Sequence, residues 1–133
     1  MFSLETKILV IDDMLTMRKI VMKTLKEMGY TDIEEAANGQ EGWEKLQSGS
    51  FGLVVSDWNM PVCTGLDLLK RVRADGKLGK LPFILVTAEA EQQQVAAAIK
   101  SGVDQYVVKP FSKESLMGKL ELAYKKCALR KAA

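Results

Sequence analysis

Five short runs of mostly apolar residues divide the chain into segments of similar length. Each run is about as long as a β-strand, and near-continuous apolar runs are typical of parallel strands that are covered on both faces. The second run is the weakest, and the turn signal Asn38-Gly39 follows it. The strands predicted from this pattern are residues 7–11, 32–37, 51–56, 82–87 and 105–108.

The segments between these runs carry apolar residues at helical spacing. In residues 15–28, Met17, Val21, Leu25 and Met28 recur on one face. Strands that alternate with helices favour an α/β fold with a parallel sheet and right-handed crossovers. We expect one domain over residues 1–133, because this length suits a single core. The predicted helices are residues 15–28, 39–47, 66–73, 89–100 and 113–130.

Composition narrows the classes of function. The formal net charge of +2 is too small to favour nucleic acid as a partner, and we expect none. No apolar run approaches the roughly 20 residues of a membrane span, and residues 1–7 lack a signal-peptide pattern. Cys63 and Cys127 lack metal-ligand spacing, which favours a reduced, cytoplasmic compartment. The chain has no histidine, which excludes histidine-based acid–base catalysis and metal ligation within it.

Polar side chains follow four of the five predicted strands. These are Asp12 with Asp13, then Asp57, Thr87 and Lys109. The carboxyl ends of parallel strands share one edge of the sheet, where ligands bind in folds of this kind. Three ionised carboxylates would repel one another there, so we expect a divalent cation. Oxygen ligands favour magnesium, calcium or manganese, and a small ligand set favours magnesium.

These residue types suit phosphoryl transfer. A carboxylate such as Asp57 can attack phosphorus, while a cation and a hydroxyl, here Lys109 and Thr87, can meet the charge on the transferred group. Each residue also has a simpler interpretation. Asp13 alone fits a helix cap equally well, and Asp57 alone fits an Asx-turn better. Thr87 alone fits a strand-end packing residue, and Lys109 a solvated surface lysine. The phosphoryl-transfer hypothesis depends on their combination.

Several stretches resemble the receiver domain of two-component response regulators, and most closely its stand-alone chemotaxis members. The resemblance covers nearly the whole chain, and its specific matches are Ile11-Asp12-Asp13, Thr16-Met17-Arg18, Ser56-Asp57-Trp58-Asn59-Met60-Pro61, Ile84-Leu85-Val86-Thr87-Ala88-Glu89-Ala90 and the stretch from Gly102 through Tyr106-Val107-Val108-Lys109-Pro110-Phe111. The resemblance implies a flavodoxin-like sandwich with strand order 2-1-3-4-5. It also implies a signalling protein, rather than an enzyme, that assists its own phosphorylation and dephosphorylation.

The resemblance assigns roles to single residues. It implies that Asp57 is the phosphoacceptor, and that Asp13, Asp57 and the backbone carbonyl of Asn59 bind Mg2+ directly. Asp12 would act through a bound water, and the Lys109-Pro110 bond would be cis. Thr87 and Lys109 would sense the phosphoryl group, and Tyr106 would be an aromatic switch.

The same resemblance implies partners. They are a chemotaxis histidine kinase, the flagellar motor switch protein and a phosphatase, and we expect a monomer. Two departures from the chemotaxis relatives bear on these partners. The loop after Pro61 has Cys63-Thr64 before Gly65, where relatives usually have an acidic residue before the glycine. Glu91 to Gln94 stand where motor-binding relatives tend to carry lysine.

Alternatives therefore stay open. The target could be a non-motor protein, or the chain could serve as a phosphate sink. A magnesium-dependent phosphatase is less well supported, since such enzymes usually present Asp-x-Asp and here the aspartates are adjacent. A flavin-binding carrier of the same topology would need a hydroxyl- and glycine-rich loop in place of Asp12-Asp13. No DNA-binding segment follows, so we expect no direct gene regulation.

Overall fold

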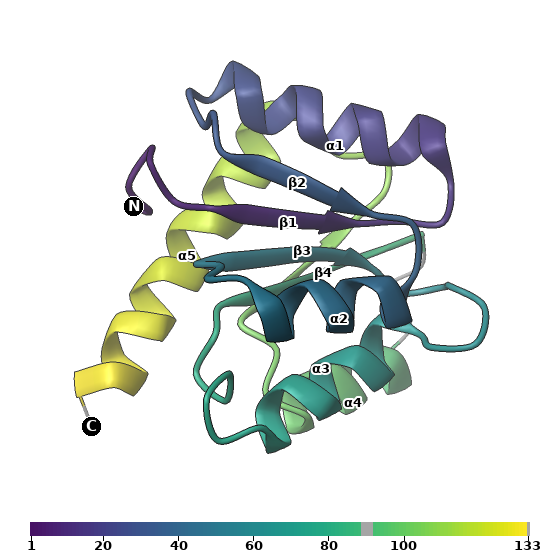
Figure 1. The fold of residues 1–133 in the computed structure, drawn as a ribbon. Helices are drawn as coiled ribbons and strands as arrows, with labels where there is room; N and C mark the ends of the chain where they lie inside the picture. The colour runs from purple at the N-terminus through teal and green to yellow at the C-terminus, as the bar shows by residue number, and fades with distance from the viewer. Residues whose placement is uncertain (89–91, 133) are drawn as a thin grey trace.

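The computed structural model describes residues 1–88 and 92–132 and contains a central sheet covered by helices on both faces (Figure 1). All neighbouring strands pair in parallel, in the order β2-β1-β3-β4-β5. The predicted fold class and strand order are therefore confirmed. The strands are β1 (Ile8–Ile11), β2 (Ile33–Ala36), β3 (Leu53–Asp57), β4 (Phe83–Thr87) and β5 (Gln105–Val108).

The predicted strand boundaries are correct for β5 and wrong by one or two residues elsewhere. The largest difference is at β3, which begins at Leu53 rather than at Phe51. Its ladder extends to Asp57, because Asp57 still pairs with Val86 of β4. The candidate phosphoacceptor is thus the last residue of a strand and not the first residue of a loop.

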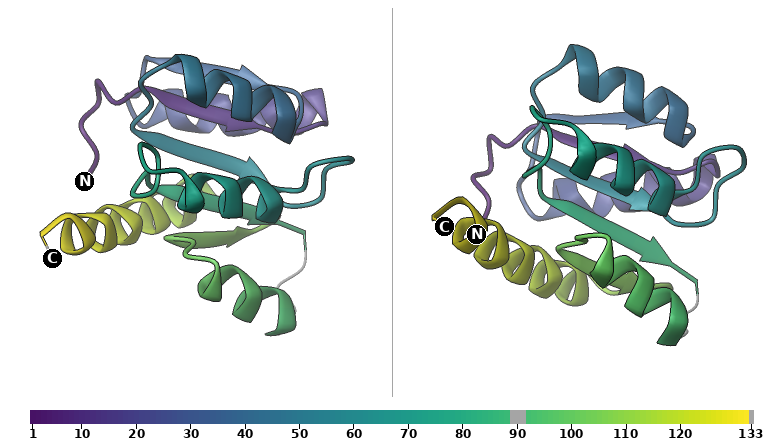
Figure 2. Two further views of the ribbon diagram at one scale, coloured as in Figure 1. Left: turned by 60° about the horizontal axis from the view of Figure 1, so that its bottom comes forward. Right: turned by 90° about the horizontal axis from the view of Figure 1, so that it is seen from below.

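The helices form two layers around the sheet. Helices α1 and α5 cover one face, and α2, α3 and α4 cover the other (Figures 1 and 2). The prediction for residues 89–100 is confirmed from Gln92 onward, and its first three residues lie outside the described part of the chain. The helices are α1 (Leu15–Glu27), α2 (Gly39–Ser48), α3 (Gly65–Ala74), α4 (Gln92–Lys100) and α5 (Lys113–Ala132).

Each central strand sends alternate side chains into two separate hydrophobic cores. In β1, Leu9 and Ile11 pack beneath α2 and α3, whereas Ile8 and Val10 pack beneath α1 and α5. All four are at most 1% exposed. Burial on both faces explains why these strands are apolar without a polar alternation.

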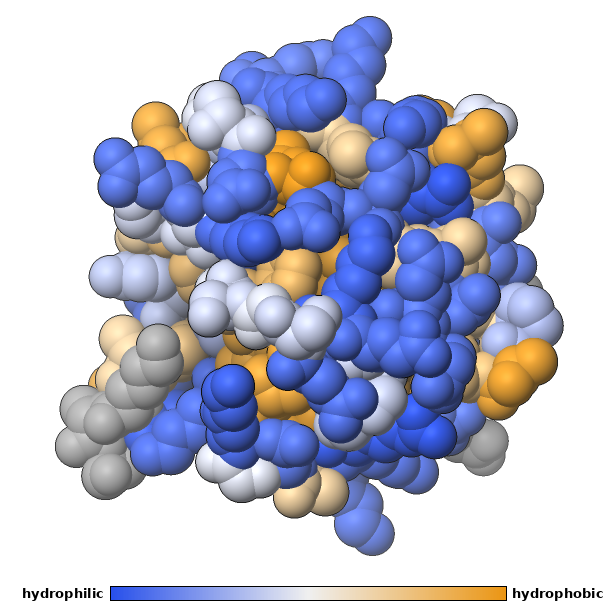
Figure 3. Space-filling model, in the orientation of Figure 1, coloured by the Kyte–Doolittle hydropathy of each residue, from blue (hydrophilic) through white to orange (hydrophobic). Residues whose placement is uncertain are grey.

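The strands all point away from the end of the molecule that holds both chain termini (Figure 2). Their carboxyl ends therefore form a single edge, from which the β1–α1 and β3–α3 loops emerge. The face drawn in Figure 3 is mainly hydrophilic, with apolar side chains in separate small patches. In the described part of the chain, no helix combines the length and the apolar character needed to cross a membrane.

Candidate functional site

Two adjacent carboxylates follow β1 and differ sharply in exposure. Asp12 is 2% exposed, whereas Asp13 is exposed to solvent. The Asp12 N–H extends the sheet by donating to the Ala36 carbonyl oxygen at 3.2 Å. Its Oδ1 accepts the N–H of Met14 at 2.9 Å, which tightens the turn into α1. The turn thereby directs one carboxylate inward and leaves the next at the surface.

Asp57 lies at the centre of the same edge. Its strand, β3, runs between β1 and β4, and the residue is 7% exposed. The N–H of Trp58 donates to the Val86 carbonyl oxygen at 2.9 Å, so the backbone on both sides of the carboxylate is held by the sheet. Gly65 closes the loop behind it with a hydrogen bond from its N–H to the Trp58 carbonyl oxygen at 2.9 Å.

The fold brings three of the predicted metal ligands together. Asp12, Asp13 and Asp57 each offer a carboxylate oxygen, and these oxygens lie within 4.8 Å of one another. An all-oxygen set of this size fits magnesium, calcium or manganese. Asn59 is exposed in the β3–α3 loop, two residues beyond Asp57.

Lys109 reaches the same carboxylates from the end of β5. Its Nζ lies 3.1 Å from Asp57 Oδ1 and 3.6 Å from Asp12 Oδ2. Its backbone N–H donates to the Thr87 carbonyl oxygen at 2.7 Å, and the Lys109-Pro110 bond is cis, as the resemblance implied. The simpler interpretation of Lys109 as a solvated surface residue is wrong, because its side chain is only 17% exposed.

The surroundings of Asp57 disfavour its charge. Burial raises the pKa of the Asp57 carboxyl above its ordinary value, and repulsion by Asp12 raises it further. The hydrogen bond and the positive charge of Lys109 act in the opposite direction. A cation that replaced or joined Lys109 at these oxygens would favour the ionised form, which is the form that can act as a nucleophile.

The remaining predicted residues lie on the two adjoining strands. Thr87 is 2% exposed at the end of β4. Tyr106 of β5 pairs with Leu85, so it sits two positions before the strand ends, half-buried against the core. The Lys119 Nζ lies 5.0 Å from the centre of its ring. Thr87 is thus at the carboxylate edge, whereas Tyr106 is set back from it, against the core beneath α2, α3 and α4.

Sequence reasoning missed two residues that contact this edge. Arg18 donates from Nη1 to the backbone carbonyl oxygen of Asp12 at 2.8 Å, and from Nε to Glu35 Oε1 at 2.8 Å. The only signal was the position of Arg18 within a stretch that resembles receiver domains. Glu35 carried no signal, because one glutamate on a weakly patterned strand predicts no partner.

The chain matches the response regulator receiver domain over residues 8–121, which is most of its length. The chain belongs to this family. The receiver is 46% identical to chemotaxis protein CheY1 of Helicobacter pylori strain J99, over 87% of this chain and 94% of the relative. It is also 46% identical to chemotaxis protein CheY of Pseudomonas aeruginosa, over 90% of this chain and 97% of that protein.

Solved structures agree with this assignment. The receiver superposes on the chemotaxis response regulator CheY4 of Vibrio cholerae with a TM-score of 0.82 and 34% identity, covering 90% of this chain and 98% of that one. The family, its fold and its role in phosphorelay signalling of the chemotaxis type follow from these matches.

Proposed function

We propose that this chain, as a single receiver domain over residues 1–133, takes a phosphoryl group from a chemotaxis histidine kinase onto Asp57 in the presence of Mg2+. The observation that carries the proposal is the convergence of three carboxylates and one lysine at a single sheet edge. The relatives named as chemotaxis proteins support the kinase class. The protein acts as a cytoplasmic monomer and is a phosphoacceptor rather than an enzyme with a separate substrate.

Different groups of the chain have different roles in the proposed phosphoryl transfer. Asp57 supplies the attacking oxygen: a bond forms between Asp57 Oδ and phosphorus while the bond from phosphorus to the donor's histidine nitrogen breaks. Mg2+, when bound, neutralises the carboxylates and the phosphoryl oxygens. Asp13, Asp57 and the Asn59 carbonyl would hold the ion directly, and Asp12 would hold it through water. The burial of Asp57 keeps bulk water away from the reacting oxygen.

Phosphorylation would change the charge that Lys109 and Thr87 meet. The new group carries roughly −1.5 to −2 charges and presents three acceptor oxygens. Lys109 would exchange its contacts with Asp12 and Asp57 for these oxygens, and the Thr87 hydroxyl would turn towards them. Tyr106, on the strand paired with β4, would then move inward. The result is a shift between two packings of the surface formed by α4, β5 and α5.

This α4–β5–α5 surface has the chemistry of a protein-binding site. Val108 and Leu122 are large apolar residues that are 38% and 48% exposed. Lys119 lies over the Tyr106 ring on the same surface, so a movement of Tyr106 would displace a positive charge. We infer that the flagellar motor switch protein is the target. The absence of lysine from Glu91 to Gln94 keeps a non-motor target or a phosphate-sink role as the alternative.

The test uses the fluorescence of Trp58, which adjoins Asp57 and is 8% exposed. Mg2+ with a small phosphodonor, or with beryllofluoride, should change the emission of the wild type and leave Asp57→Asn unchanged. A phosphodonor that neither changes the signal nor labels Asp57 would refute the proposal. Steady hydrolysis of unrelated phosphate esters would instead favour a phosphatase. A motor-switch peptide should bind only the beryllofluoride-treated protein, and no binding would favour the non-motor alternative.

A further inference from the structure

A charged side chain outside the phosphoacceptor site holds the backbone of the β1–α1 turn. We propose that Arg18 is a positioning residue that keeps the Asp12–Asp13 turn in its metal-binding form. The inference rests on the proposed magnesium site. It adds a residue that touches neither the ion nor the phosphoryl group and acts through the backbone of Asp12.

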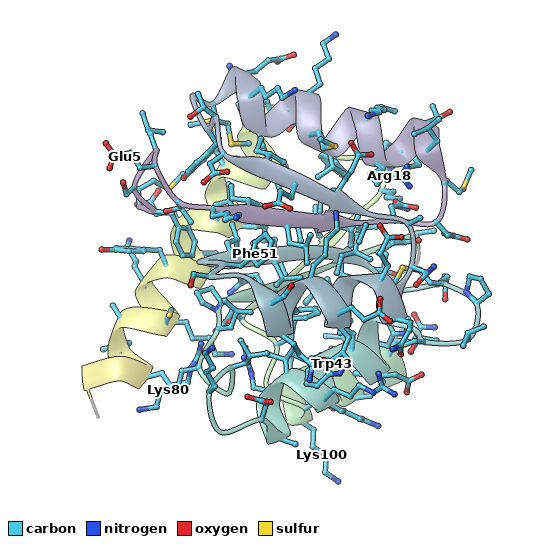
Figure 4. The ribbon with its side chains drawn as sticks, viewed as in Figure 1. Glu5, Arg18, Trp43, Phe51, Lys80 and Lys100 are labelled. Atoms are coloured by element: carbon cyan, nitrogen blue, oxygen red, sulfur yellow. The ribbon has the colours of Figure 1, made fainter. Side chains whose placement is uncertain are left out.

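Arg18 lies one turn into α1, beside the carboxyl-terminal end of β2 (Figure 4). Side chains on a helix lean towards its N-terminus, so the guanidinium of Arg18 reaches back over the turn that begins the helix. The side chain is 12% exposed. Two of its nitrogens donate to different acceptors, Nη1 to the Asp12 carbonyl oxygen and Nε to Glu35, both at 2.8 Å.

The contacted carbonyl belongs to the peptide group that joins Asp12 to Asp13. A hydrogen bond to that oxygen restricts rotation of the peptide plane, and therefore the direction in which the Asp13 side chain leaves the backbone. The Ala36 carbonyl oxygen holds the N–H of Asp12, and the Met14 N–H holds its Oδ1. No side chain caps the N-terminus of α1 at Met14, so the helix start itself adds little to fix the turn.

Glu35 serves as the anchor of Arg18. It stands on β2 one position before Ala36, so the sheet fixes its backbone relative to β1. Its carboxylate also accepts from Lys19 Nζ at 3.0 Å. The Glu35 carboxylate and the Arg18 guanidinium thus connect β2 to the Asp12–Asp13 turn. A planar guanidinium whose nitrogens bond to two fixed acceptors keeps its direction better than an ammonium can.

Charge and positioning make opposite predictions for this residue. A positive charge near three carboxylates opposes the binding of a second cation, so removing Arg18 should tighten Mg2+ binding if Coulombic repulsion were its whole effect. If Arg18 positions the turn, its removal should weaken binding. Lys19 offers a matched control, because it carries the same charge and contacts the same Glu35, but it does not contact Asp12.

The experiment is a Mg2+ titration of the full, unphosphorylated chain, followed by Trp58 fluorescence and by calorimetry. We expect Arg18→Ala to weaken Mg2+ binding about 10-fold, the lower end of what supporting residues around metal ligands contribute. Lys19→Ala should bind Mg2+ as tightly as the wild type or slightly more tightly. Arg18→Lys should recover only part of the loss. Glu35→Gln, which retains Arg18 but weakens its anchor, should show a smaller loss than Arg18→Ala.

A metal-free measurement completes the test. Amide hydrogen exchange at Met14, whose N–H bonds to Asp12 Oδ1, should be faster in Arg18→Ala than in Lys19→Ala. Circular dichroism establishes that each variant is folded, and if Arg18→Ala is not, Arg18→Lys and Glu35→Gln decide. Wild-type protein that fails to bind Mg2+ would overturn the proposed metal site and this inference together. Normal binding by the wild type, with unchanged or tighter binding by folded Arg18 variants, would overturn this inference alone.

Discussion

Asp104→Asn tests a buried ion cluster at the end of the sheet opposite the phosphoacceptor site. Asp104 is 1% exposed, just before β5. Its Oδ2 accepts the N–H of Phe83 at 2.8 Å and Nη2 of Arg73 at 2.9 Å, and its Oδ1 accepts Nη1 of Arg130 at 2.5 Å. One carboxylate therefore ties the ends of α3 and α5 to the first residue of β4.

The substitution keeps the shape of the side chain and removes its charge. An asparagine supplies one acceptor oxygen where the carboxylate supplies two, and its amide N–H groups would face the donors of Phe83 or of an arginine. Removing one partner of a buried ion pair costs about 3–5 kcal/mol. Arg73 still donates to the carbonyl oxygens of Gly102 and Leu81, and Arg130 is 26% exposed, so the lower end of this range applies. We expect a loss of about 3 kcal/mol in the free energy of unfolding.

Urea denaturation followed by circular dichroism measures this loss directly. A chain of 133 residues has an unfolding entropy of about 0.28 kcal/mol/K near 60 °C, so the same loss should lower Tm by roughly 10 °C. Asp32→Asn is the control, because it makes the same chemical change at an exposed position and should stay within about 0.5 kcal/mol of the wild type. A loss below about 1 kcal/mol in Asp104→Asn would show that the arginines find other partners, and would refute the argument.

Three further predictions follow from single positions. Val62 is fully exposed at a φ of 67°, which is strained for a β-branched residue, so Val62→Asn should stabilise the fold by about 1 kcal/mol in urea denaturation. A Cβ on Gly65 would collide with the Asp57 carbonyl and approach Leu85 Cδ2 to 2.8 Å, so Gly65→Ala should cost about 2–3 kcal/mol and slow labelling of Asp57 by a small phosphodonor. The hydrogen bonds from Arg18 and Lys19 lower the pKa of Glu35. The ionised Glu35 carboxylate therefore stabilises the folded state at pH values above the ordinary carboxyl pKa, and this stabilisation is lost as the pH falls through the lowered pKa. Glu35→Gln should therefore cost roughly 0.5 kcal/mol at pH 7 and nothing at pH 2, in urea denaturation at each pH.

Matched variants sharpen these three tests. Val62→Ala keeps the strain and should stabilise much less than Val62→Asn, so equal effects of the two would contradict the backbone argument. Gly118→Ala in α5 meets no atom within 4 Å and should stabilise by about 0.5–1 kcal/mol, whereas a stabilising Gly65→Ala would contradict the close approach. A cost of Glu35→Gln that is the same at both pH values would show that packing, not the charge of the carboxylate, is responsible.

Much of the fold could be predicted because its local signals agree with its tertiary environment. Strands buried on both faces must be apolar throughout, and helices buried on one face must carry apolar residues every three or four positions. These requirements are visible in the sequence itself, for example as the uninterrupted apolar run Ile8–Ile11 of β1. Strand ends were less predictable, because pairing decides them: Asp57 belongs to β3 only through its partner Val86.

The convergence of Asp12, Asp13, Asp57 and Lys109 could also be predicted, because parallel strands place their carboxyl ends on one edge whatever the register. The distances could not. The contact between Lys109 and Asp57 joins residues 52 positions apart, and it depends on the order of β3, β4 and β5 and on one lysine rotamer. Sequence patterning carries the first kind of information and not the second.

The sequence by itself therefore determined the alternation of strands and helices and the chemical groups delivered to the sheet edge. Only the tertiary structure decided which charged side chains pair across the fold. Arg18 meets Glu35 across 17 positions, and Asp104 meets Arg73 across 31 and Arg130 across 26. Such pairs have no periodicity, because they form where the ends of separate elements happen to pack together. Their partners are fixed by the geometry of the folded chain, and they leave no pattern along it.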